Sequence, residues 1–222
     1  MMSRYYTCMN YSIKDLQDEV QGKDIYLIGG GKSFDPETHI PMLPVSRVVT
    51  LNAALGDFKE CLAVMWMDSN WYGENTKLIR EQRPRYAVEF TINNQRPETR
   101  NTGRIRIRNA SCSKCDYTTK REKYNVCGNN TGCCAIDLLD QLGAKTIYLL
   151  GFDCREDDGV SHYHKRYKNH VKQAIYDKNF IPCFERLSKH ISTSRVVNLS
   201  ENSRIGCFKK SSINNLLKGE YK

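Results

Sequence analysis

Short apolar runs recur along the chain, and polar stretches separate them. We predict strands at residues 24–28, 47–51, 61–67, 86–92, 146–150 and 195–199. Such continuously apolar strands are typical of a parallel sheet that helices cover on both faces. Residues 102–109 instead alternate strictly between polar and apolar positions, which predicts an edge strand with one polar face.

Helical patterns occupy the stretches between these strands. Ser12, with Asp15 three residues later, is expected to cap a short helix within 12–20. Further helices are predicted at 74–82, 131–142, 168–178 and 182–190, and Gly143 ends the second of these. Strands that alternate with helices predict an α/β protein, with a Rossmann-like, doubly wound and mostly parallel sheet in a single domain spanning 1–222.

A basic, cysteine-rich segment at 93–127 interrupts this alternation, and we predict that it is an insert that could serve as a lid over the site. Cys112 and Cys115 form a C-x-x-C pair, and Cys127 and Cys133 follow, so four thiolates could hold a structural zinc ion. The last spacing is poor, because Cys133 falls at the start of a predicted helix. We therefore expect free thiols and no bound metal.

The formal net charge of +9 favours anionic partners such as nucleotides, nucleic acid or charged glycans. Basic residues concentrate at 96–108, 114–123 and 165–172, although any one cluster would also suit a solvated loop. No apolar run approaches the length of a membrane span, and no secretory signal is visible near the first residues. We therefore expect a cytoplasmic protein in a reducing compartment, and its ten cysteines are interpreted as thiols.

Polar or small residues stand where each predicted core strand ends. In a doubly wound sheet, ligands bind beyond the carboxyl ends of the strands, at the point where the strand order reverses. We therefore expect these residues to converge on one crevice, with Trp71 at its rim. They are Gly29, Gly30, Gly31 and Ser33 after the first strand, Asn52 after the second, Asp68 after the third and Asp153 after the strand at 146–150.

The triple glycine at Gly29–Gly31 is a candidate phosphate-binding loop. Glycine accepts a positive φ and lets backbone N–H groups come close to an anion. The loop departs from both common phosphate motifs, because Tyr26 stands where a P-loop needs its first glycine and Phe34 stands where a dinucleotide fingerprint needs its third. A plain tight turn is the alternative interpretation.

The sequence Ser-His-Tyr-His at 161–164 is a candidate catalytic element. His162 and His164 flank Tyr163 among lysines, and such residues can bind phosphate and supply a base near neutral pH. A basic surface loop is the alternative. The other two histidines in this half of the chain, His170 and His190, fall in predicted helices and are expected at the surface.

The order of these motifs resembles that of the single-domain bacterial sialyltransferases, which use a CMP-activated sugar. It is also similar to the wider superfamily that includes archaeal-type hydroxymethylpterin diphosphokinases, and it looks closest to phage-encoded members called norphogenetic proteins. The resemblance runs from about residue 24 to residue 208. It rests on GGGKS at 29–33, Asn52, the stretch Asn-Thr-Gly at 130–132, IYLLGFD ending at Asp153, SHYH at 161–164 and NSRIGCF at 202–208.

This resemblance implies a glycosyltransferase that uses a CMP-sugar-like donor, a hydroxyl acceptor and an inverting general-base mechanism, without a required cofactor. His164 fits the base, while His162 remains a rival because SHYH lacks two residues of the family motif. Tyr163 and Ser33 would hold the phosphate, and Asn52 the nucleoside. Further nucleotide contacts would come from the glycine loop and from Thr131, Gly132, Asp68 and Asp153, although Asp153 could instead be structural.

Two other functions remain open from the sequence. A pyrophosphokinase on the same scaffold would need a divalent metal, for which Asp68 and Asp153 are candidate ligands. A non-catalytic phage protein that binds nucleotides or nucleic acid is the other alternative. The donor sugar is open, the acceptor could be acidic or a nucleic acid, and the protein could be a homo-oligomer in the host cytoplasm.

Overall fold

A computed structural model describes residues 11–91, 104–109, 123–166 and 171–217. One parallel sheet of eight strands organises this part of the chain, in the order β5-β4-β3-β2-β1-β6-β7-β8. The strands are β1 (Asp24–Ile28), β2 (Val48–Leu51), β3 (Ala63–Trp66), β4 (Tyr86–Thr91), β5 (Ile105–Arg108), β6 (Thr146–Leu150), β7 (Arg195–Asn198) and β8 (Lys209–Lys210).

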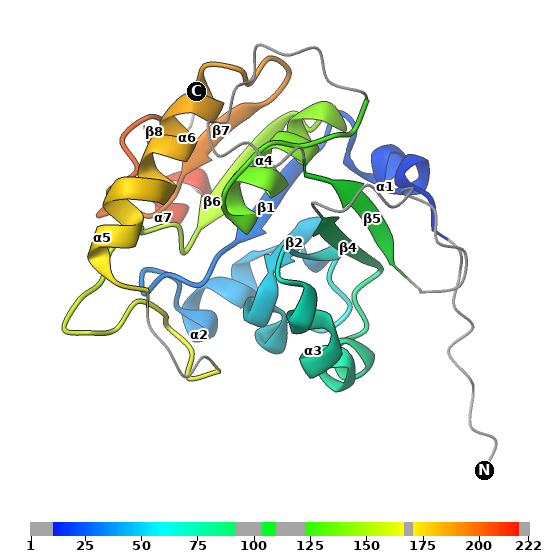
Figure 1. The fold of residues 1–222 in the computed structure, drawn as a ribbon, viewed down its shortest axis with the longest axis horizontal. Coiled ribbons are helices and arrows are strands. Elements are labelled where there is room, and N and C mark those ends of the chain that lie inside the picture. Colours follow the sequence, from blue (N-terminus) through cyan, green and yellow to red (C-terminus); the bar gives the residue numbers. More distant parts are fainter. Residues whose placement is uncertain (1–10, 92–103, 110–122, 167–170, 218–222) are drawn as a thin grey trace.

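Helices cover both faces of the sheet and bury an apolar layer on each (Figure 1). On one face lie α1 (Ile13–Val20), α4 (Thr131–Gln141) and α6 (Ile181–Ser188). On the other lie α2 (Pro36–His39), the 3₁₀ segments η1 (Ile40–Met42), η2 (Val45–Arg47) and η3 (Asn52–Asp57), α3 (Ser69–Gln82) and α7 (Ile213–Leu217). The predicted α/β fold with a parallel, Rossmann-like sheet is confirmed.

Local sequence signals explain where several elements begin and end. Ser12 caps α1 in a reciprocal capping box with Asp15, as predicted. Asn130 caps α4, because its side chain accepts a hydrogen bond from the N–H of Cys133. Gly143 follows that helix with φ +82°, a left-handed conformation that glycine adopts without steric cost.

The strand order reverses between β1 and β6. The chain runs outward from β1 to β5 at one edge, and α4 then carries it back across the sheet to β6, which pairs with β1 on its other side. Beyond these two strands, the N–H of Gly29 donates to the carbonyl of Leu150 at 2.8 Å, and the N–H of Gly31 donates to that of Gly151 at 2.8 Å. The loops after β1 and β6 therefore meet where such folds bind their ligands.

The edge strand predicted within 102–109 is confirmed, since β5 is the outermost strand on one side of the sheet. The isolated bridge between Asn109 and Val126 ties two further residues of the predicted insert to the sheet edge. The rest of the insert, including most of the predicted lid, lies outside the described residues.

One predicted helical boundary is wrong. The helix expected at 168–178 begins at Gln173 in the described part of the chain, as α5 (Gln173–Ile175), and it runs on through a π-turn, η4 (Tyr176–Phe180), into α6. Pro182 has no N–H to continue an α-helical ladder, and the backbone widens immediately before it. One continuous helical segment therefore replaces the two that were predicted.

Candidate functional site

A cavity of about 460 Å³ lies at the reversal of strand order. Residues from the ends of β1, β2, β3 and β6 and from the start of α4 line it, together with three residues of the Ser-His-Tyr-His loop. The predicted site residues that line it are Gly29, Gly30, Gly31, Asn52, Asp68, Thr131, Gly132, Asp153, His162 and His164. The structure thus brings together residues that lie far apart in the sequence. Ser33 and Tyr163, which were also predicted, do not line the cavity.

The three glycines of the loop serve two different purposes. None of them adopts the positive φ that we expected, so close approach rather than backbone freedom explains them. A Cβ on Gly29 would lie 2.6 Å from the carbonyl oxygen of Gly151, and one on Gly31 would lie 2.7 Å from the same oxygen. These two glycines therefore permit the tight contact between the loops after β1 and β6.

Gly30 faces the cavity instead. A Cβ there would lie 2.9 Å from Nδ1 of His162 and 3.6 Å from Nε2 of His164. The carbonyl of Gly30 also accepts a hydrogen bond from the N–H of Tyr163 at 3.0 Å. The Ser-His-Tyr-His loop at 161–164, called the histidine loop below, therefore packs directly against Gly30.

Ser33 and Asp153 bind each other through two hydrogen bonds. The N–H of Ser33 donates to Oδ2 of Asp153 at 2.7 Å, its hydroxyl donates to Oδ1, and the same hydroxyl contacts Oγ of Ser200 at 2.8 Å. Asp153 is buried, and both of its carboxylate oxygens accept hydrogen bonds from Ser33. This contact fits the structural role that we left open for Asp153.

The N-terminus of α4 forms a polar wall of the cavity. The first turn of a helix presents N–H groups without intrahelical acceptors, and its dipole favours an anion nearby. Nδ2 of Asn52 donates to Oγ1 of Thr131 at 3.5 Å, and Asn52 has φ 49°, a left-handed conformation that asparagine tolerates better than most residues. The end of β2 and the start of α4 are thereby joined at the cavity.

The two histidines lie parallel, with ring centroids 5.6 Å apart and an interplanar angle of 5°. His164 is buried. Burial is the main cause that lowers the pKa of His164 to about 4, and the nearby His162 and Arg166 lower it further, while Asp57 opposes them. His164 is therefore neutral at pH 7, the form in which one ring nitrogen carries no proton.

Tyr163 points away from the cavity, although the resemblance placed it on the phosphate. Its hydroxyl donates to Oδ2 of Asp57 at 2.7 Å, and its ring meets Phe34 edge-on at 5.1 Å. Asp57 is also held by Arg166, through two hydrogen bonds of 2.8 and 2.7 Å. Sequence reasoning missed Asp57, and it recognised Arg166 only as part of a basic run.

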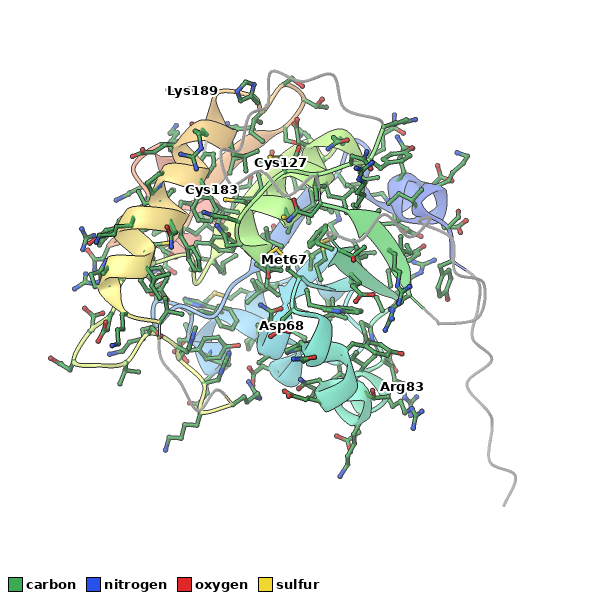
Figure 2. All side chains as sticks on the ribbon, in the orientation of Figure 1. Met67, Asp68, Arg83, Cys127, Cys183 and Lys189 are labelled. Atoms are coloured by element: carbon green, nitrogen blue, oxygen red, sulfur yellow. The ribbon has the colours of Figure 1, made fainter. Side chains whose placement is uncertain are left out.

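Asp68 lines the cavity and is exposed. Figure 2 shows Met67 and Asp68 between α4 and α3, near the middle of the molecule. Asp68 caps α3, since Oδ1 accepts the N–H of Asn70 at 2.9 Å. Trp71 is largely buried, and it lines the cavity as expected.

Aromatic residues that the sequence analysis did not select form another wall of the cavity. Tyr176, Phe180 and Phe184 line it from the π-turn and α6, at a spacing of four residues, and Phe152 follows β6. Burial is the main cause that raises the pKa of Tyr176 to about 12. A spacing of four residues indicates one face of a single helix. This face was missed because two separate helices were predicted, at 168–178 and 182–190.

Among the described cysteines, Cys127 departs from the expectation of free thiols. Cys127 is buried and disulfide-bonded. Cys127 is therefore no thiolate ligand for zinc in this structure, and the interpretation of every cysteine as a thiol is wrong there. Cys112 and Cys115 lie outside the described residues, and Cys133 is a free thiol.

The described ranges hold neither a metal-binding cluster nor a membrane-spanning helix. No group of three or more histidine, cysteine, aspartate or glutamate side chains lies together there in a way that would hold a metal ion. No helix in those ranges is long and apolar enough to cross a bilayer.

No family model and no curated protein matches the sequence. The fold is similar to that of the MAf glycosyltransferase from Magnetospirillum magneticum AMB-1, with a TM-score of 0.56 and 13% identity over 87% of this chain and 34% of that chain. It is also similar to the monofunctional alpha-2,3-sialyltransferase Cst-I from Campylobacter jejuni, with a TM-score of 0.53 and 17% identity over 96% of this chain and 85% of that chain.

This chain therefore spans about a third of the length of the first of these proteins. At such identities the likeness shows a shared fold. It agrees with the resemblance to sialyltransferases at the level of the fold, and it gives no support to the finer likeness to phage proteins or to pterin diphosphokinases.

Proposed function

We propose that the protein transfers a sugar from a nucleotide-activated, CMP-sugar-like donor to a hydroxyl group of an acceptor. The observation that carries this proposal is the placement of a buried, neutral histidine beside a glycine loop and a helix N-terminus in one cavity. The fold shared with a glycosyltransferase and a sialyltransferase supports it.

Binding of the donor would use the polar wall of the cavity. The phosphate would lie between Gly30 and the first turn of α4, where N–H groups and the helix dipole meet a negative charge. Asn52 and Asn130 would contact the nucleoside, and Asp68 a ribose hydroxyl or the acceptor. Among the described residues that line the cavity there is neither lysine nor arginine, which favours a donor with a single phosphate charge.

The chemical step would use His164 as a general base. As the acceptor oxygen attacks the anomeric carbon, His164 takes the proton from the hydroxyl. The bond between that carbon and the phosphate oxygen breaks, and the nucleotide leaves with the electron pair. Attack from the side opposite to the phosphate inverts the anomeric configuration.

His162 would assist the leaving group. Its ring lies parallel to that of His164 and beside Gly30, so a ring N–H of His162 would donate to the phosphate as negative charge grows there. The two histidines would then have different roles, because burial and the neighbouring charges keep His164 neutral.

A thermal-shift screen of nucleotides and nucleotide sugars tests the proposal, with and without magnesium. A ligand at 100 times its dissociation constant stabilises a protein by about 2.7 kcal/mol. We expect CMP and CMP-sugars to stabilise the protein without magnesium, and a CMP-sugar to be cleaved with release of CMP. Turnover that requires magnesium and nucleoside triphosphate would favour the pyrophosphokinase, and salt-dependent DNA binding without turnover would favour a nucleic-acid-binding protein.

A further inference from the structure

We propose that Tyr163, Asp57 and Arg166 form a clamp that positions the two histidines over Gly30, and that Tyr163 acts through this clamp instead of touching the donor phosphate. The inference rests on the proposed function, because it assigns a role within the same reaction. The clamp joins the loop that carries His162 and His164 to η3, the segment that follows β2.

Asp57 is the centre of the clamp. Its Oδ2 accepts hydrogen bonds from the Tyr163 hydroxyl at 2.7 Å and from Nη1 of Arg166 at 2.8 Å, and its Oδ1 accepts one from Nη2 of Arg166 at 2.7 Å. A two-pronged contact between guanidinium and carboxylate fixes the orientation of both groups more firmly than a single bond. Arg166 also donates to the carbonyl of Ala53 at 3.3 Å, so both ends of η3 are tied to the histidine loop.

Tyr163 is held at three points. Its N–H binds the carbonyl of Gly30, its ring packs edge-on against Phe34, and its hydroxyl binds Asp57. The ring also meets that of His164 edge-on, with centroids 4.8 Å apart. Because His162 and His164 are its immediate neighbours in the chain, fixing Tyr163 fixes the direction in which both histidines project.

The clamp also pairs the charges of Asp57 and Arg166. Asp57 raises the pKa of Arg166, and Arg166 and Tyr163 bind the Asp57 carboxylate so that its pKa is lowered despite burial. The positive charge of Arg166 is thereby committed to Asp57. Burial and Asp57 raise the pKa of Tyr163, so its hydroxyl stays protonated and continues to donate to Asp57.

The test compares Tyr163→Phe, Asp57→Asn and the double variant with wild type, using CMP as the binding probe and a CMP-sugar as the substrate. We expect Tyr163→Phe to lower kcat by about 10- to 100-fold, because loss of positioning on the scale of an ångström has effects of that size. The Kd for CMP should stay within about twofold. The double variant should lose no more than Asp57→Asn alone, since both changes break the same clamp.

Tyr124→Phe is the matched control. The Tyr124 hydroxyl donates to Oε1 of Gln17 at 2.7 Å, and Tyr124 does not line the cavity, so this variant loses the same kind of bond elsewhere. We expect it to keep wild-type kcat. A Tyr163→Phe variant that behaves like Tyr124→Phe would overturn the clamp. A tenfold or greater loss of CMP affinity in Tyr163→Phe, adding to the effect of Asp57→Asn, would show a phosphate ligand instead.

A measurement without substrate separates failure of the clamp from failure of the proposed function. The imidazole NMR signals of His162 and His164 at pH 7 should both move in Asp57→Asn, and they should stay unchanged in Tyr124→Phe. If wild type turns over no nucleotide sugar, the proposed function fails while these signals still test the positioning. If Asp57→Asn does not fold, Arg166→Lys, which keeps the charge but loses the two-pronged contact, replaces it. Unmoved histidine signals in the folded variant would refute the clamp.

Discussion

Replacing Gly30 with alanine tests the geometry on which the site depends. The new Cβ would lie 2.9 Å from Nδ1 of His162, whereas an ordinary contact between such atoms is about 3.5 Å. The ring must therefore move by the difference, about 0.6 Å, or the loop must shift by as much. The new Cβ would lie 3.6 Å from Nε2 of His164, which is an ordinary contact distance, so we expect His162 to move more than His164.

The expected result is a loss of activity that exceeds the loss of stability. Misplacing a reacting group by 1 Å can cost about 100-fold in rate, so 0.6 Å predicts a loss of kcat/KM of about tenfold. The histidine can rotate aside, and alanine also restricts the unfolded chain, so we expect a net destabilisation of about 1 kcal/mol or less. Urea unfolding measures the stability, and release of CMP from a CMP-sugar measures the activity.

Gly73→Ala is the control for this variant. Gly73 lies within α3, and a Cβ there meets nothing within 4 Å. The same chemical change should therefore leave activity intact and stabilise the fold by about 0.5–1 kcal/mol. If Gly30→Ala keeps wild-type turnover, and the bulkier Gly30→Val still binds CMP with wild-type affinity in calorimetry, the glycine loop does not belong to the site.

Three further predictions concern the stability of the fold, its dependence on pH and the state of Cys127. Gly31→Ala should destabilise the protein by about 3 kcal/mol in urea unfolding, because its Cβ meets the backbone oxygen of Gly151; a change below 1 kcal/mol would contradict this. The pKa of His164 is near 6.5 when unfolded and about 4 when folded, so stability should fall by about 1–2 kcal/mol as the pH drops from 6.5 to 4, and His164→Gln should flatten this dependence. Peptide mapping without reductant should find Cys127 in a disulfide-linked peptide; a free Cys127 thiol would be the contrary result.

The fold was predictable because its signals are local. The apolar runs at 24–28 and 146–150 match β1 and β6, and the caps at Ser12 and Asn130 lie within a few residues of the helices that they start. The rule that ligands bind at strand ends then placed the glycine loop, Asn52 and Asp153 in one crevice. These steps needed only the periodicity of the sequence and the topology of a doubly wound sheet.

The direction of individual side chains was not predictable. His162 and His164 line the cavity whereas Tyr163 between them binds Asp57, which is 106 positions away in the sequence. Ser33 likewise binds Asp153 across 120 positions. Such contacts depend on how loops from different strands pack, and neither hydrophobic periodicity nor local spacing records that packing.

The comparison of His164→Ala with His162→Ala, on the same CMP-sugar, tests the central claim most directly. Loss of a general base typically costs 10² to 10⁴ in rate. We predict that His164→Ala loses kcat by about that factor while its Kd for CMP is nearly unchanged, and that His162→Ala loses much less turnover or loses CMP affinity instead. A large loss of turnover in His162→Ala alone would reverse the two roles, and wild-type turnover in both variants would contradict a histidine mechanism at this cavity.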